Sequence, residues 1–193
     1  GEDVYFAHGI WFNDEELTLL QKTGTGISHC PSSNMRLGSG IARIKEMLSK
    51  NIPVSLGVDG SASNDSSDML GEARNALLLQ RVRYGSDALS ARDVLKMATI
   101  NGARMLNYSQ IGIVKEGMGA DLALFDISSL QYAGALSDPA AALLFTGYNH
   151  QTRYTIVNGR VVVRDGRFMG YDEEKLAAKI NQISEKLLKK GGV

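Results

Sequence analysis

The chain has 193 residues, enough for one hydrophobic core or for one domain with an appendage, and its 21 basic and 21 acidic side chains balance to a formal net charge of zero. Without blocks of like charge there is no electrostatic reason to expect a nucleic acid or an anionic membrane as a partner. Because no apolar run approaches the roughly 20 residues that span a bilayer, no segment is like a signal peptide and Cys30 is the single cysteine, we expect a soluble, cytoplasmic protein.

The first part of the chain alternates between short apolar runs and helix-like segments. The expected strands cover residues 4–7, 26–29 and 54–58, and the expected helices follow the N-cap Asn13 and occupy 41–48. The stretch 31–40 between them is predicted to be a loop. Strands that alternate with helices of this length indicate βαβ units and a parallel sheet.

The composition changes in the second part of the chain. Helices are expected at 69–83, 91–99 and 102–106, followed by a turn-rich segment at 112–119, a strand at 121–126, a hairpin at 154–163 and a helix at 172–190. The hairpin is the sharpest of these signals, because Asn158-Gly159 suits a type I′ turn. We therefore expect barrel-type units over residues 1–110, a β-rich subdomain over 111–171 and a C-terminal helix over 172–193.

Polar residues follow each of the three expected parallel strands: His8, then His29 with Cys30, then Asp59. In a (β/α) barrel the carboxyl ends of the strands form the active-site face. Asp59 could bind a divalent metal or act as a base on a metal-bound water, or it could cap the following turn. His8 could bind a metal or move a proton, or it could be a hydrogen-bonded core histidine.

Other candidates have a more ordinary interpretation. His29 and Cys30 are neighbours on a strand, so their side chains point to opposite faces and are not expected to bind one metal. His29 is expected to be structural or to line the substrate site. Arg36 could bind a substrate carbonyl or carboxylate, although an exposed arginine is the simpler expectation, and His150 is interpreted as a surface histidine.

Several stretches together resemble the amidohydrolase superfamily, in its branch of deaminases and chlorohydrolase-like triazine hydrolases. They are Ala7–Trp11, Ser28–Gly40, Leu56–Asp65, Gly117–Asp126 and Val157–Val162. Within the branch, the loop after Asp59 and the segment Leu77–Arg83 are most similar to 8-oxoguanine deaminases. The resemblance implies an α/β fold, namely the C-terminal part of a TIM-like (β/α)8 barrel with a small appended β-rich sandwich subdomain and a C-terminal helix.

The resemblance also implies an activity and the residues that carry it. His8, His29 and Asp59 would end the sixth, seventh and eighth barrel strands, with His8 and Asp59 catalytic and Asp59 a ligand of one divalent metal, zinc or iron. The substrate would be a small molecule, an aminopurine or related cyclic amidine like 8-oxoguanine, which hydrolysis by a metal-activated water would deaminate. The residues expected to bind it are His29, Asn34, Arg36, Ser63 and Asn64.

The chain departs from the family pattern in its metal ligands. It contains no His-x-His pair, and a catalytic zinc usually has three protein ligands. We therefore expect the other ligands to lie upstream of Gly1, and the 193-residue chain alone to be inactive and to bind zinc weakly or not at all. The alternatives are a cyclic-amide hydrolase, similar to imidazolonepropionase or dihydroorotase, and a non-catalytic split half-barrel that needs a partner chain. An unpaired sheet edge would favour a homo-oligomer.

Overall fold

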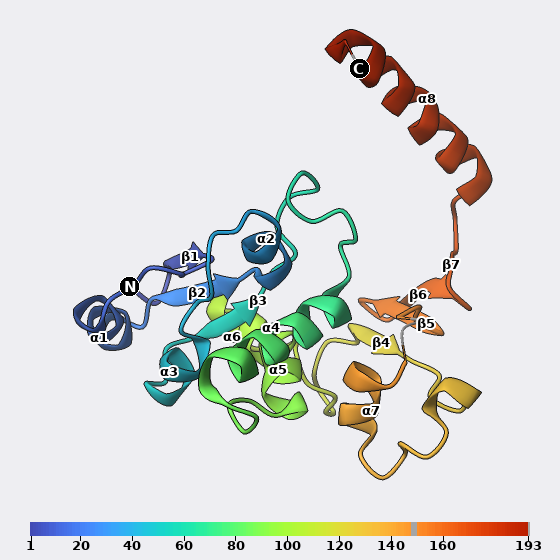
Figure 1. Cartoon of the computed structure of the whole chain (residues 1–193). Coiled ribbons are helices and arrows are strands. Elements are labelled where there is room, and N and C mark those ends of the chain that lie inside the picture. Colours follow the sequence, from blue (N-terminus) through green and yellow to red (C-terminus); the bar gives the residue numbers. More distant parts are fainter. Residues whose placement is uncertain (148–149, 193) are drawn as a thin grey trace. The chain divides into compact units, whose positions relative to one another are not determined.

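The computed structural model describes residues 1–147 and 150–192. The chain divides into two compact units (Figure 1). The first consists of Gly1–Met118 with Ile127–His150, and the second of Gly119–Asp126 with Gln151–Val193. The domain boundaries expected near residues 110 and 171 stay a prediction.

A three-stranded parallel sheet forms the centre of the first unit. Its order is β1 (Tyr5–Ala7), β2 (Gly26–His29) and β3 (Val54–Leu56). Helix α1 (Asp14–Thr23) connects the first two strands, and α2 (Pro31–Arg36) and α3 (Ile44–Ser49) connect the second pair. All three strands run in the same direction, so the expected α/β organisation with a parallel sheet is confirmed. The carboxyl ends of the strands consequently meet at one edge of the sheet.

Local signals explain α1 but not α2. Asn13 accepts a hydrogen bond from the Glu16 backbone, the Glu16 side chain accepts one from the Asn13 backbone, and Gly24 ends the helix in the left-handed conformation. Helix α2 begins at Pro31, and no side chain caps it. The prediction of a loop throughout 31–40 is therefore wrong over the span of α2, where only the proline at the first turn indicated a helix.

The remaining helices of the first unit lie beside β3 and one another. They are α4 (Met69–Tyr84), α5 (Ala91–Met97), α6 (Ile100–Met105), a short 3-10 helix at Leu130–Tyr132 and α7 (Pro139–Phe145). Helices α4, α5 and α6 contact β3, and α7 contacts α4 and α5 (Figure 1). Side chains from the sheet and from the helices of the first unit, α1 and α3 included, are fully buried, among them Leu17, Ile27, Ile44, Met47, Val54, Leu77 and Val94. Helix α7 was not predicted, although Asp138 before Pro139 is a typical start of a helix.

The second unit contains an antiparallel sheet and the C-terminal helix. The strand order is β4 (Leu122–Leu124), β5 (Tyr154–Val157), β6 (Arg160–Arg164) and β7 (Arg167–Phe168), and α8 covers Glu173–Gly191. Asn158 and Gly159 have φ angles of 48° and 75°, which are both positive as a type I′ turn requires, so the predicted hairpin is confirmed. No helix within the described residues is both long enough and apolar enough to cross a bilayer.

Candidate functional site

Side chains that follow the outer two strands of the parallel sheet come together at its carboxyl edge. His8 follows β1 and Asp59 lies beyond the end of β3, and His8 Nε2 is 3.8 Å from Asp59 Oδ2. Their side chains are 36% and 32% exposed, so a small molecule can reach both. Each residue has a positive φ, 67° for His8 and 64° for Asp59, which is uncommon for residues other than glycine and is found at functional sites.

Two glycines allow the backbone to pass close to β2 beside these residues. Gly9 has a φ of 62°, and a Cβ at this position would lie 2.9 Å from Ile27 Cγ2. A Cβ at Gly57 would lie 2.7 Å from Ser28 Oγ. Both distances are shorter than van der Waals contact, so side chains at these positions would push the flanking strand ends away from β2.

Two hydroxyl groups hold the carboxylate of Asp59. Ser33 Oγ donates to Asp59 Oδ2 at 2.6 Å, and Ser63 Oγ donates to the same oxygen at 2.8 Å. These two hydrogen bonds, with one from the backbone of Gly60, lower the pKa of Asp59 from 3.8 to about 2. Asp59 is therefore ionised at neutral pH and can accept a proton from a sufficiently acidic group.

The imidazole of His8 is oriented by the residue next to Ser33. His8 Nδ1 and Asn34 Oδ1 are 2.8 Å apart. Because an amide oxygen only accepts hydrogen bonds, Nδ1 carries the proton and Nε2 faces Asp59. Helix α2, which the sequence analysis missed, thus supplies neighbouring residues that contact His8 and Asp59.

His29 and Cys30 are buried beneath the site. His29 is fully buried, and burial, with a smaller contribution from nearby His8, lowers its pKa to about 3. Neither of its ring nitrogens has a hydrogen-bond partner among the described residues. Burial, followed by the charge of Asp59, raises the pKa of the Cys30 thiol. Both side chains are therefore neutral at pH 7.

The other residues expected to bind substrate have different surroundings. Arg36 forms an ion pair with Asp65 and is half-exposed. Asn64 is buried, and its Nδ2 donates both to Val58 O and to Glu72 Oε1, each at 2.8 Å. Glu72 is 1% exposed, and it was not among the residues predicted for the site. The only hint in the sequence was an acidic residue within the otherwise buried face of α4.

The interpretation of His150 as a surface histidine is wrong. Its side chain is only 14% exposed, and Nδ1 forms a hydrogen bond with the carboxylate of Asp68. Asp68 also caps α4 by accepting from the Leu70 backbone. Because these residues lie far apart in sequence, no local pattern indicated the pair.

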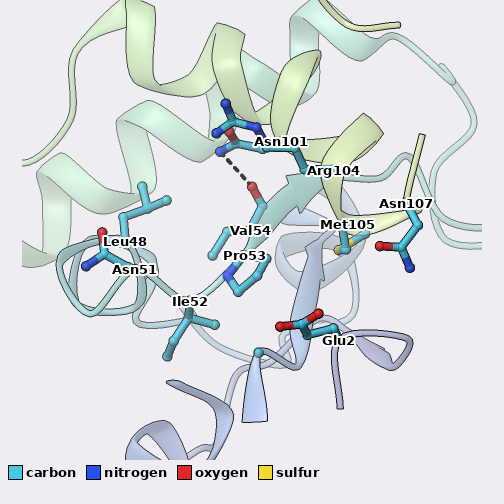
Figure 2. Close-up of a pocket in the computed structure, with 11 residues that line it drawn as sticks. Glu2, Leu48, Asn51, Ile52, Pro53, Val54, Asn101, Arg104, Met105 and Asn107 are labelled. Atoms are coloured by element: carbon cyan, nitrogen blue, oxygen red, sulfur yellow. Dashed lines mark hydrogen bonds between the residues drawn. The ribbon is translucent and has the colours of Figure 1, made fainter. Parts of the chain in front are cut away.

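Hollows lie at both ends of the parallel strands. One, of about 410 Å³, includes His8 in its lining. Another, of about 450 Å³, is lined by residues before or at the start of the strands, including Glu2, Gly24 and Val54, and Figure 2 shows Asn101 bonded to the Val54 carbonyl there. This second hollow lies at the opposite strand ends from His8 and Asp59, and the lining of the first includes His8 but not Asp59. The approach of His8 to Asp59, rather than either hollow, therefore marks the candidate site.

The acidic and histidine side chains do not make a complete metal site. Within residues 1–147 and 150–192, no group of three or more His, Cys, Asp or Glu residues is arranged to hold a metal ion. Among these described residues, Asp59 therefore lacks the two further protein ligands that a catalytic zinc usually has.

Comparison with known sequences identifies the family. Residues 1–162 match the amidohydrolase family. The chain is 45% identical over 188 residues to the 8-oxoguanine deaminase of Pseudomonas aeruginosa, covering 97% of this chain and 41% of that protein. It is 38% identical over 185 residues to the 5-methylthioadenosine/S-adenosylhomocysteine deaminase of Pyrococcus furiosus, covering 95% and 44%. The chain thus spans about two-fifths of the length of these relatives.

Comparison with solved structures agrees with the sequence match. An atrazine chlorohydrolase from Arthrobacter aurescens, complexed with zinc, superposes with a TM-score of 0.89 at 34% identity over 94% of this chain and 41% of that chain. An adenosine deaminase from Xanthomonas campestris, with bound zinc, gives a TM-score of 0.93 at 28% identity over 98% and 43%. The expected resemblance to deaminases and triazine hydrolases is confirmed.

Proposed function

Because this chain belongs to the amidohydrolase family, we propose that it supplies part of the active site of a metal-dependent hydrolytic deaminase. The substrate is an aminopurine or a related cyclic amidine, with 8-oxoguanine as the first compound to test. Support comes from the curated relatives, which include deaminases of 8-oxoguanine, 5-methylthioadenosine and 5′-deoxyadenosine. Deaminases among these relatives favour expulsion of ammonia over the opening of a cyclic amide.

The approach of His8 to Asp59 carries this proposal. In the reaction, the oxygen of water bonds to the carbon that bears the amino group and the C–N bond breaks. Of the two water protons, one leaves with the amino group as ammonia and the other stays on the product. Asp59 is ionised at neutral pH and accepts the first of these protons. His8, with Nε2 turned toward the same space, takes up a proton there and as a cation stabilises the negative charge that develops on the substrate when water adds.

The metal is part of the proposal for the complete protein. A divalent ion, zinc or iron, lowers the pKa of a bound water to near neutrality. We propose Asp59 as the one ligand from this chain, since the described residues contain no set of three. The described residues do not fit such an ion on their own.

The fold of the complete protein is proposed on the same basis. We assign β1, β2 and β3 to the sixth, seventh and eighth strands of a (β/α)8 barrel, within a barrel part at 1–110. Residues 111–171 then form the appended sandwich subdomain and 172–193 the C-terminal helix. All three residues of β1 are exposed, which is unusual for a strand of a parallel sheet and is consistent with further strands or a second copy at this edge.

The five residues proposed to bind substrate differ in their exposure to solvent. Arg36 and Ser63 are accessible, and we propose that they contact the substrate directly. His29, Asn34 and Asn64 are buried, and we propose that they shape the site from behind.

The test is ammonia release from a panel of aminopurines, hydroxytriazines and cyclic amides. The sample is the longest polypeptide that the gene encodes, loaded with zinc or iron, beside the 193-residue chain alone. We expect the long polypeptide to release ammonia from an aminopurine, Asp59→Asn to abolish this and the exposed control Asp87→Asn to leave it unchanged. Ring opening without ammonia would refute the deaminase assignment. Stoichiometric zinc and deaminase activity in the 193-residue chain would refute the incomplete metal site.

A further inference from the structure

A buried carboxyl group lies behind the candidate site and has no role in the proposed chemistry. Glu72, in the first turn of α4, is 1% exposed, and both of its oxygens accept hydrogen bonds. Asn64 Nδ2 donates to Oε1 at 2.8 Å, and the backbone N–H of Ser32 donates to Oε2 at 3.1 Å. Burying a carboxyl group is costly unless its oxygens are hydrogen-bonded, so these two bonds offset the cost of burying Glu72.

The two donors belong to the two segments that hold Asp59. Ser32 precedes Ser33, whose hydroxyl donates to Asp59 Oδ2 at 2.6 Å. Asn64 follows Ser63, whose hydroxyl donates to the same oxygen at 2.8 Å. Glu72 therefore joins α2 to the loop after β3 immediately behind the residues that converge on Asp59.

Further bonds make this connection rigid. Asn64 Nδ2 also donates to Val58 O at 2.8 Å, and Asn64 Oδ1 accepts from Ser66 Oγ at 3.0 Å. Asn75, one turn after Glu72 on α4, donates to Ser32 Oγ at 2.9 Å. A network of paired groups around the buried Glu72 and Asn64 restricts the segments it joins to one arrangement.

We propose that Glu72 is a positioning residue for Asp59. By holding Ser32 and Asn64 together it places the Ser33 and Ser63 hydroxyls on one oxygen of the Asp59 carboxylate. The consequence for catalysis rests on the function proposed above, whereas the consequence for the loop does not.

The substitution Glu72→Gln tests this with little change in shape. A glutamine must turn its NH2 group toward either Asn64 Nδ2 or the Ser32 N–H, and each of these is a donor. One of the two bonds is therefore lost and one buried donor is left unpaired.

Gln80 provides a matched control on the same helix. It is fully buried, its Oε1 accepts from the Lys45 backbone at 3.0 Å, and its Nε2 donates to Ala42 O at 2.9 Å. Gln80→Glu replaces the donor facing Ala42 by an acceptor, and so breaks a similar bond toward α3 instead of toward Asp59.

The first measurement is amide hydrogen exchange of the 193-residue chain. Glu72→Gln should speed exchange at Ser32, Ser63 and Asn64 by about tenfold relative to wild type. Gln80→Glu, which loses the bond to Ala42, should speed exchange only around Ala42 and leave those three unchanged. Equal exchange at Ser63 and Asn64 in wild type and Glu72→Gln would overturn the proposal. This outcome does not depend on the activity of the protein.

The second measurement is steady-state kinetics of the longest polypeptide that the gene encodes. If Glu72 positions Asp59, Glu72→Gln should lower kcat by about tenfold or more with KM within about twofold, while Gln80→Glu keeps both. An unchanged kcat with faster loop exchange would show that the network is merely structural and would overturn the positioning role. If wild type has no deaminase activity, the proposed function fails, and the exchange experiment still decides whether Glu72 holds the loop.

Discussion

Replacing Ser33 by alanine removes the closest hydrogen bond to Asp59. The pKa of Asp59 is about 2 instead of 3.8, and the Ser33 hydroxyl is the largest cause, ahead of Ser63 and the Gly60 backbone. Without this hydroxyl the remaining two donors still favour the ionised form, so we expect the pKa of Asp59 in Ser33→Ala to rise toward its ordinary value of 3.8 without reaching it. Ser63→Ala should raise it by a smaller amount.

The sign of the effect on stability follows from the direction of the shift. A lowered pKa in the folded state contributes stability that is present above pH 3.8 and is lost as the pH falls toward 2. In Ser33→Ala this contribution is smaller, so acid unfolding should begin at a higher pH.

The pKa can be measured from the ¹³C chemical shift of the Asp59 carboxyl group during an acid titration by NMR. Ser32→Ala is the control, because the Ser32 hydroxyl accepts from Asn75 and does not bond to Asp59. An Asp59 pKa that is the same in wild type and Ser33→Ala, or that rises equally in Ser32→Ala, would refute the reasoning.

Three further predictions concern the same site. The pKa of His29 is lowered from 6.5 to about 3, so the unfolded chain binds this proton more tightly and stability should fall as the pH drops from 6.5 toward 3. The free energy of unfolding should change by at most about 1.4 kcal/mol per pH unit. Urea unfolding at several pH values should show a smaller pH dependence of this free energy for His29→Asn, and an equal pH dependence would contradict burial as the cause. In Gly9→Ala the alanine would have a φ of 62°, and its Cβ would lie only 2.9 Å from a side-chain carbon of β2. The free energy of unfolding of this variant should therefore fall by more than about 1 kcal/mol. Gly170→Ala is the control and should have little effect, because no atom lies within 4 Å of the added Cβ. Asn34→Leu removes the acceptor for the Nδ1–H of His8. The ¹⁵N chemical shifts of the His8 ring should then show a shift of the tautomer toward the Nε2–H form. An unchanged tautomer would mean that Asn34 does not orient the ring.

Elements with strong local signals were predictable from the sequence. Helix α1 has a capping box around Asn13, and the β5–β6 hairpin has an Asn-Gly turn with two positive φ angles. The alternation of apolar runs and helices indicated a parallel sheet, and the parallel direction alone places residues after each strand at one edge. His8 and Asp59 could therefore be selected as candidates before any distance was known.

Local sequence signals are too weak to predict helix α2. It has six residues and no capping side chain, so its own propensity is too small to specify a helix. Its contacts with α4, and the bond from the Ser32 backbone to Glu72, hold it in place. Such support comes from residues that are distant in sequence, and a pattern within one segment does not contain it.

The sequence by itself determined which polar residues end the parallel strands, because strand periodicity and turn chemistry act over a few neighbouring residues. Only the tertiary structure decided what those residues touch. Ser33 lies 26 residues from Asp59, Asn34 lies 26 from His8, and Glu72 lies 40 from Ser32, yet each pair is hydrogen-bonded. These partners meet because the packing of α2 and α4 beside the sheet brings separate segments together, and the free energy of that packing depends on the whole unit rather than on any one stretch of chain.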